Sequence, residues 1–234
     1  NTNDLVDFLI AADGIFSDTK SFFEKKKNKP KFKKAIAIRS ILKSKYELDI
    51  EEKNISLIMG GGFHMVLYPI NKNNELNLVS IIREKKYDPD NLTSLIKKKV
   101  LIQNPNFKDI FSGDLKSWPI YSTPQILPST NEKVFYIGDA FYGLLPSMAQ
   151  GAGQSIESAY ELFNVLNKNN KNAQRIYFNQ RLKRIKLIKR RSNLNFFIFH
   201  FSSSILQSLR NFIMQQFFKR GRFVKSYLKA IYKN

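Results

Sequence analysis

Two aspartates of this sequence stand where short apolar runs end beside a glycine. The run Phe8–Ala12 ends at Asp13-Gly14, and the run Val134–Ile137 ends at Gly138-Asp139. A carboxylate at the carboxyl end of a buried strand can accept hydrogen bonds from sugar hydroxyls, and glycine lets the backbone approach a ligand closely. An ordinary strand-to-helix turn, with the aspartate as a helix cap, has the same pattern. On this stretch alone, both interpretations of Gly138-Asp139 stay open.

A glycine-rich segment follows the second aspartate. Gly143 and Pro146 indicate a loop, Gly151-Ala152-Gly153 comes next, and a helix is expected from Gln154 to Leu166. The unpaired N–H groups at a helix start favour negative charge. Strand, acid, glycine-rich loop and helix start, in this order, are typical of an α/β site for a nucleotide-like cofactor.

Together the two segments resemble the paired fingerprints of the FAD-dependent aromatic hydroxylases, which are single-component flavoprotein monooxygenases. The first fingerprint is matched by Ala12, Asp13, Gly14, Ser17 and Lys20. The second is matched by Gly138, Asp139, Ala140, Pro146, Ala149, Gln150, Gly151, Glu157 and Ala159. The form Ala149-Gln150-Gly151-Ala152 is most similar to the salicylate-hydroxylase branch of that family.

The resemblance implies FAD and NAD(P)H as cofactors and gives the fingerprint residues roles. Asp139 is then expected to bond the ribityl chain of FAD, Pro146 to shape the loop, and the segment Gln150, Gly151, Ala152, Gly153 to pass the pyrimidine edge of the flavin. Asp13 and Gly14 are expected to support both cofactors.

Three residues depart from the family pattern. Lys20 stands where the family carries arginine, so a phosphate contact there should be weaker, because lysine lacks the bidentate fork. Tyr142 replaces a histidine of the motif, and Gly153 replaces an asparagine.

A histidine and a tyrosine are the candidate catalytic residues. The segment Gly60–Ile70 is similar to a strand of the family's substrate domain, and it contains His64 and Tyr68. Four residues apart on a strand, their side chains share a face. The resemblance places that face over the flavin, where either group could hydrogen-bond a phenol and assist its deprotonation. A satisfied core pair is the alternative, and His200 is expected to be structural.

The activity that the resemblance implies is insertion of one oxygen atom from O2 into a small aromatic substrate. The family's opening Gly-x-Gly-x-x-Gly motif does not occur. We therefore expect the carboxyl-terminal part of a longer enzyme, inactive alone. The alternatives are a basic module without flavin that binds a membrane or nucleic acid, and a related flavin reductase acting on an isoprenoid-type substrate.

The expected fold class is α/β (α+β). It comprises a partial FAD-binding Rossmann-like domain without its first βαβ unit, an inserted mainly antiparallel substrate domain, and carboxyl-terminal helices. The expected boundaries are 1–25 and 121–170 for the flavin-binding part, 26–120 for the substrate domain, and 171–234 for the basic helices.

Local patterns predict the elements of these domains. Ala35–Ile38 fits a strand or a helix, and the resemblance favours a strand. The apolar runs 55–59, 65–70 and 76–82 predict an antiparallel sheet, with turns at Gly60–Gly62 and Asn71–Asn74. Further expectations are a helix capped by Asp90 and running to Ile102, an extended connection at Trp118-Pro119, and helices at 173–192 and 204–218 with a stop at Gly221.

Composition excludes several kinds of site. The 234 residues contain no cysteine and two histidines, which excludes disulfides, thiolate metal sites and a histidine-rich metal centre. We expect no metal and a cytoplasmic protein. The net charge of +20 would attract nucleic acid, but no nucleic-acid-binding motif accompanies it, so no such partner is expected.

The final third of the chain is basic and aromatic, with no acidic residue after Glu161. Its aromatic side chains could pack against the flavin domain with the cations in water, which the packed helices of family members favour. Peripheral contact with an anionic membrane is the alternative.

Overall fold

The computed structural model describes residues 5–24, 29–43, 54–70, 75–168, 171–219, 226 and 229. The chain divides into two compact units. Unit 1 comprises residues 1–32 and 121–195, and unit 2 comprises residues 33–120 and 196–234. The expected turn at Asn71–Asn74 and the expected stop at Gly221 lie outside the described residues.

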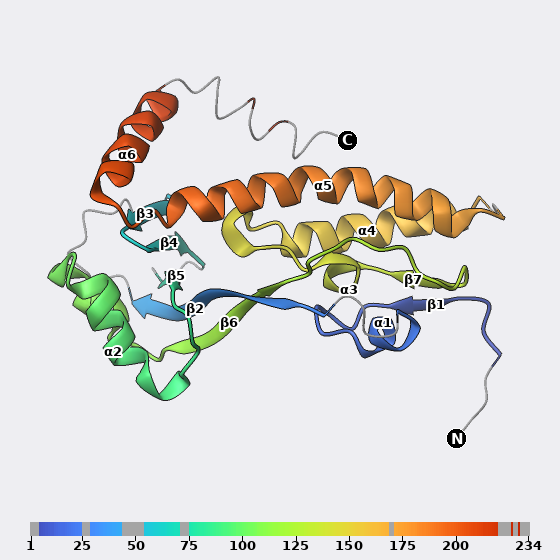
Figure 1. Ribbon diagram of the computed structural model, residues 1–234, viewed down its shortest axis with the longest axis horizontal. Coiled ribbons are helices and arrows are strands. Elements are labelled where there is room, and N and C mark those ends of the chain that lie inside the picture. The colour runs from blue at the N-terminus through green and yellow to red at the C-terminus, as the bar shows by residue number, and fades with distance from the viewer. Residues whose placement is uncertain are drawn as a thin grey trace. The chain divides into compact units, whose positions relative to one another are not determined.

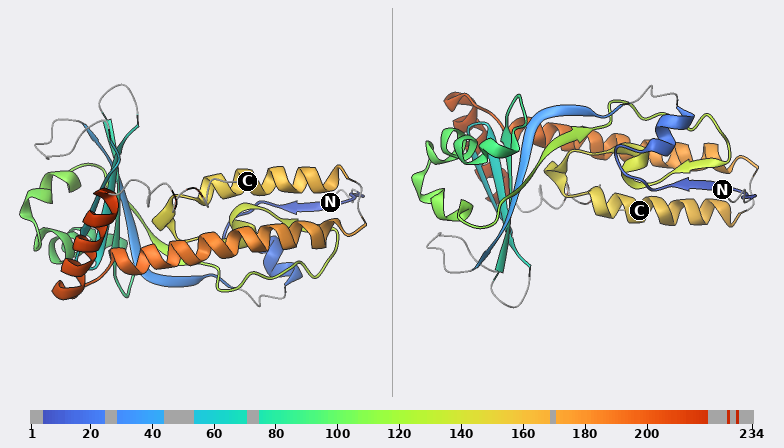
Figure 2. Two further views of the ribbon diagram at one scale, coloured as in Figure 1. Left: turned by 90° about the horizontal axis from the view of Figure 1, so that it is seen from above. Right: turned by 90° about the horizontal axis from the view of Figure 1, so that it is seen from below.

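A parallel pair of strands lies at the centre of unit 1. Strand β1 (Leu9–Ala11) pairs with β7 (Val134–Tyr136) in the register Leu9↔Val134 to Ala11↔Tyr136. The helices of the unit are α1 (Asp18–Phe23), α3 (Gly138–Tyr142), α4 (Gly151–Leu166) and most of α5 (Ala173–Phe199), as Figure 1 shows. Helix α4 runs alongside the strand pair in both views of Figure 2.

Burial of β7 explains why this short strand forms. Its residues Val134, Phe135 and Tyr136 are all buried, as expected for a strand that is covered on both faces. They pack with Leu162 of α4 and Tyr177 of α5 in one apolar cluster. The Tyr177 hydroxyl donates a 2.8 Å hydrogen bond to the Tyr136 carbonyl, so α5 is fixed at the end of β7.

Unit 2 contains a five-stranded sheet in the order β3-β4-β5-β2-β6. The strands are β2 (Lys31–Lys43), β3 (Ser56–Gly60), β4 (Phe63–Pro69), β5 (Glu75–Arg83) and β6 (Lys116–Ser122). The pairs β3–β4, β4–β5 and β5–β2 are antiparallel, which confirms the predicted sheet and the strand at Ala35–Ile38. Gly62, at φ +80°, completes the turn between β3 and β4.

Side-chain alternation gives this sheet two different faces. One face holds the apolar core of unit 2, formed by alternate residues of β2, β4 and β5 together with Ile96, Val100 and Ile110. The second face carries the residues in between, among them His64 and Tyr68 of β4. The candidate catalytic pair therefore shares a face, as its spacing predicts, and that face is opposite the core.

Two details of unit 2 differ from the sequence predictions. Asp90 does not cap the helix: the Asp88 carboxylate accepts from the Asp90 N–H at 3.1 Å, because Pro89 begins the first turn. The expected single helix is a 3-10 turn (Pro89–Asn91), α2 (Leu92–Ile96) and a π-helical turn (Lys97–Leu101). Trp118-Pro119 is extended as predicted, but it belongs to the edge strand β6, where a proline is tolerated.

The helices of the carboxyl-terminal half are longer than the patterns predict. Helix α4 begins at Gly151, so Gly151–Gly153 form its first turn instead of a loop. Helix α5 continues beyond residue 192 to Phe199, and Phe196 and Phe199 in the added part are buried. Helix α6 (Ser204–Lys219) agrees with its prediction within one residue.

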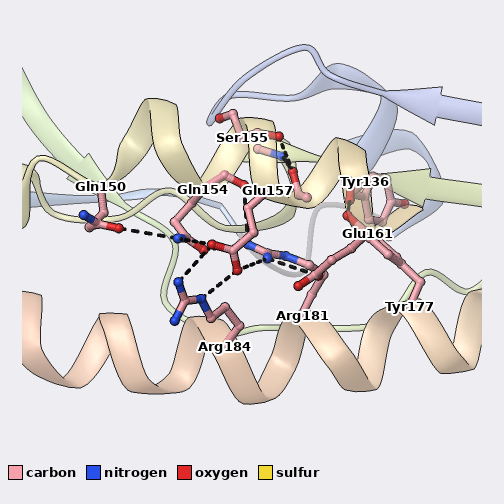
Figure 3. A network of polar contacts seen from close by, with 11 residues as sticks. Tyr136, Gln150, Gln154, Ser155, Glu157, Glu161, Tyr177, Arg181 and Arg184 are labelled. Carbon is pink, nitrogen blue, oxygen red and sulfur yellow. Dashed lines mark hydrogen bonds and ion pairs between the residues drawn. The ribbon is translucent and has the colours of Figure 1, made fainter. Parts of the chain in front are cut away.

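A buried arginine joins α4 to α5. Arg181 of α5 is 1% exposed, and its Nη1 lies 3.1 Å from carboxylate oxygens of both Glu157 and Glu161 on α4 (Figure 3). Its Nη2 donates to Gln154 Oε1 at 2.9 Å, while Arg184 contacts both carboxylate oxygens of Glu157. An arginine this deeply buried requires such partners, because an unpaired buried charge is strongly destabilising. The network therefore fixes α4, and with it the helix start at Gly151.

Candidate functional site

The two aspartates meet at one edge of unit 1. Because β1 and β7 are parallel, their carboxyl ends lie at the same edge, and Asp13 and Asp139 each follow one of these ends. The sequence separation between them exceeds 120 residues, so only the strand pairing brings them to this edge. Ligands of open α/β sheets bind outside the carboxyl ends of the strands.

Gly138 sets the direction of the chain between β7 and Asp139. It adopts φ +56°, a conformation that side chains strongly disfavour. Its N–H donates to Ser158 Oγ at 3.0 Å, and an added Cβ would lie 2.7 Å from Ser155 Oγ. Both serines belong to the first two turns of α4. Glycine is therefore required here for two independent reasons, and the turn lies directly against the start of α4.

The Asp139 side chain is exposed in the first turn of α3. Among the described residues it makes no hydrogen bond or ion pair. The protein around it removes part of its hydration, which raises the pKa of Asp139 above its ordinary value. An acceptor without a partner in the described part of the chain, held at this edge by a glycine turn, is suited to a ligand that donates hydrogen bonds.

The start of α4, the helix that Gly138 contacts, is open. Gly151, Ala152 and Gly153 are exposed, and an added Cβ on either glycine would meet no atom within 4 Å. No side chain caps the helix start at Gln150, whose side chain is buried. Pro146, also exposed, begins the 3-10 turn Pro146–Met148 that precedes it. The first N–H groups of α4 can therefore receive an anionic or electron-rich ligand edge.

Asp13 differs from Asp139 because it already has a partner. Its carboxylate accepts from the Thr19 N–H at 3.1 Å and so holds the start of α1. Burial raises the pKa of Asp13, but hydrogen bonds from Ser17 and Thr19 outweigh that effect, and the pKa is lowered overall. Gly14 follows at φ +81° with open space around it.

Lys20 points into unit 1. Its buried ammonium group donates to the carbonyls of Ala140 and Phe141 at 3.0 and 2.8 Å, and it lies 5.3 Å from the centre of the Tyr136 ring. Burial lowers the pKa of Lys20 to about 8. The residue ties α1 to the segment after Asp139, and its predicted phosphate contact stays a prediction.

Tyr142, which stands in the place of the motif's histidine, is buried in the core of unit 1. Burial raises the pKa of its hydroxyl to about 12, and Lys189 Nζ lies 5.0 Å from its ring centre. The substitution thus adds an apolar contact beneath the glycine-rich segment.

In unit 2, His64 is buried in a histidine pair. Its Nδ1 lies 3.1 Å from Nε2 of His200, and its ring packs edge-on against Phe199. Nδ1 of neutral His200 donates to the Phe196 carbonyl, so its Nε2 is left to accept from Nδ1 of His64. Burial lowers the pKa of His64 to about 3 and that of His200 to about 4, so both rings are neutral at pH 7.

Two polar residues that the sequence did not single out lie on the same sheet face as Tyr68. Asn77 pairs with Tyr68 across β4 and β5, and Arg39 of β2 donates from Nε to Asn77 Oδ1 at 2.6 Å. Asn77 is fully buried, and its Nδ2 has no partner among the described residues, whereas Arg39 is exposed. The alternation of Ala35, Ala37 and Arg39 could have placed the arginine on this face, but the asparagine has no such signal.

The described residues contain no group of three or more histidine, cysteine, aspartate or glutamate side chains that could hold a metal ion.

Comparison with known proteins identifies relatives of this fold. No protein-family model matches the sequence. The salicylate hydroxylase of Pseudomonas putida is 24% identical over 185 residues, which are 68% of this chain and 42% of that protein. A crystal structure of Klebsiella pneumoniae HpxO complexed with FAD and uric acid aligns with a TM-score of 0.71 and 18% identity, over 88% of this chain and 56% of that chain.

A salicylate hydroxylase substrate complex aligns with a TM-score of 0.66 and 16% identity, over 97% of this chain and 64% of that chain. The chain thus spans roughly half of the length of these relatives. The structural similarities show the fold of FAD-dependent aromatic hydroxylases, and the predicted fold class, a partial α/β flavin-binding domain with a mainly antiparallel sheet domain, is confirmed. The sequence similarity to salicylate hydroxylase also confirms the resemblance to this family.

The histidine pair generates a prediction about acid stability. In the unfolded chain both histidines titrate near pH 6.5, whereas the folded values lie near 3 and 4. Between these limits the unfolded chain binds more protons, so stability must fall as the pH drops below about 6.5, by up to about 1.4 kcal/mol per pH unit for each histidine. We expect urea titrations between pH 6.5 and 5 to show this slope.

Replacement of both histidines by glutamine should flatten that slope, because His64 and His200 are the only histidines in the sequence. The same slope in the double variant would show that the pair is not responsible.

Proposed function

We propose that this chain is part of an FAD-dependent, NAD(P)H-driven monooxygenase, which inserts one oxygen atom from O2 into a small aromatic molecule. The observation that carries the proposal is Asp139, an exposed acceptor without a partner among the described residues, which follows a glycine turn held against α4. The similarity to salicylate hydroxylase and to a structure that contains FAD and uric acid supports it.

The residues of unit 1 fit FAD. Asp139 would accept hydrogen bonds from the hydroxyls of the ribityl chain, and the N–H groups of Gly151, Ala152 and Gly153 would face the pyrimidine edge of the ring. A helix start at that position stabilises the negative charge that the reduced ring carries. When bound, the flavin supplies hydride acceptance and oxygen activation, and the protein supplies orientation and charge.

Asp13 and Gly14 lie at the same edge and would line the route by which NAD(P)H approaches. The Asp13 carboxylate would support cofactor binding indirectly, because it accepts a hydrogen bond from the Thr19 N–H and so holds the start of α1. Lys20 would act on the cofactor indirectly, through the carbonyls of Ala140 and Phe141 that follow Asp139.

The second face of the unit 2 sheet supplies candidate substrate contacts. Tyr68, half-buried, can hydrogen-bond a phenol, and the exposed Arg39 offers a positive charge on the same face, held through its Nε by the buried Asn77. The proposed role of His64 is the weaker of the two catalytic candidates, because the ring is buried and its Nδ1 is engaged by His200. This group of donors suits an aromatic substrate with an acidic or carbonyl substituent.

The proposed location is the cytoplasm, which a chain without cysteine suits. A related flavin reductase is the rival with the same fold, and a basic binding module without flavin is the rival of another class. A basic module would bind no flavin, which distinguishes it from the proposed enzyme. A reductase would bind flavin but would transfer no oxygen atom from O2 to its product.

The test uses the longest polypeptide encoded by the reading frame that contains this chain. We expect it to purify with a bound flavin that absorbs near about 450 nm and to transfer one labelled oxygen atom from O2 to product while NAD(P)H is oxidised. A folded but colourless protein would exclude the enzyme. A yellow protein that leaves its product unlabelled would identify a reductase.

Tyr68→Phe tests the substrate contacts. The substitution keeps the ring and removes only the hydroxyl, so FAD binding should be retained while the coupling of NAD(P)H oxidation to product falls, with more of the oxygen leaving as peroxide. Tyr87→Phe is the matched control: it also removes a half-buried hydroxyl of unit 2, one that bonds the Ser117 carbonyl at 2.9 Å. An unchanged coupling ratio in Tyr68→Phe would remove Tyr68 from the substrate site.

A further inference from the structure

Helix α6 presents its apolar side to solvent. Ile205 is 78% exposed, Phe212 is 62% exposed and Leu209 is 52% exposed. At about 100° per residue these side chains form one continuous stripe along the helix. The stripe comprises Ile205, Leu206, Leu209, Phe212 and Ile213, all of them exposed.

On the side of α6 that contacts the rest of unit 2, polar side chains are buried or half-buried. Arg210 is 3% exposed, and its guanidinium group donates to the carbonyls of Phe199 and Met59 at 3.3 and 3.5 Å. Gln207, half-buried, donates to the Ser202 carbonyl at 3.1 Å. A surface helix of a globular protein normally buries its apolar stripe and exposes its polar side. Arg210 joins α6 to Met59 of β3, while the side chains of the stripe stay exposed among the described residues.

The charge of the surrounding sequence indicates what covers the stripe. From Ser204 to Asn234 the chain has seven lysines and arginines and no acidic residue, and six of these cations follow Phe218. An apolar stripe that is followed in the sequence by six cations matches the interface of a bilayer, where acyl chains lie beneath anionic headgroups. Nucleic acid would complement the cations but would not bury a stripe that consists mainly of isoleucine and leucine side chains.

We propose that α6 is a peripheral membrane-binding element that lies in the interface of an anionic bilayer, with its apolar stripe among the acyl chains. None of the described helices is long and apolar enough to cross a membrane. The proposal does not depend on the proposed chemistry, because it rests on α6 and on the cations that follow it.

Vesicle sedimentation of the 234-residue chain tests the proposal. We expect binding to vesicles of phosphatidylcholine mixed with phosphatidylserine, much weaker binding to pure phosphatidylcholine, and loss of affinity as salt is raised, since headgroup attraction is screened.

A matched pair of variants distinguishes membrane binding through the stripe from nonspecific hydrophobic adsorption. Ile205→Ser removes an isoleucine of the stripe, and Ile102→Ser removes one that is equally exposed, 77%, elsewhere in unit 2. Ile205→Ser should weaken binding to the mixed vesicles by about tenfold, the effect of burying one such side chain, and Ile102→Ser should not. Circular dichroism checks that both variants stay folded.

Four results would overturn the proposal. They are no sedimentation with either vesicle, equal binding to neutral and anionic vesicles, equal effects of the two substitutions, and a chain that binds RNA more tightly than the mixed vesicles. Dimerisation that Ile205→Ser abolishes would assign the stripe to a second copy of the chain instead.

Discussion

The contact between Gly138 and α4 is the constraint on which the candidate site depends. A positive φ turns the chain at the end of β7, and the absence of a Cβ lets the turn approach Ser155 to within van der Waals contact. The N–H of Gly138 donates to Ser158, which fixes the turn on the first part of α4. Asp139 is therefore presented at the carboxyl edge of β7 by a turn in which a side chain at position 138 would meet Ser155.

The contact between Gly138 and α4 positions Asp139 only because α4 itself is held in place. Arg181, buried between α4 and α5, contacts two carboxylates and an amide of α4, and the loss of both carboxylates would leave its charge unpaired in a poorly hydrated place. The ion pairs thus act on the site from a distance, since they hold the helix whose first turn faces the ligand. Lys20 also supports the site indirectly, because its ammonium group donates hydrogen bonds to the two carbonyls that follow Asp139.

Sequence patterns predict most of the strands and the position of Asp139, because apolar runs, glycine turns and strand alternation are local properties. They fail where the determining contact is distant. Nothing near Asn77 predicts that its buried amide meets Arg39, and nothing near His64 predicts its pairing with His200. The first turn of α4 was missed because glycines are poor helix formers, although they are tolerated where the helix starts. The predicted domain boundaries and site roles stay predictions.

The measurement that tests the account most directly is the FAD dissociation constant of Asp139→Ala compared with that of Asp13→Ala. It is made by fluorescence titration of the longest polypeptide from this reading frame. Loss of a hydrogen bond to a charged acceptor should weaken FAD binding about ten- to a hundredfold for Asp139→Ala. Asp13→Ala should have a smaller effect on FAD, because that carboxylate is engaged with Thr19 and mainly supports α1. Equal FAD affinity of the unaltered protein and Asp139→Ala would contradict the account.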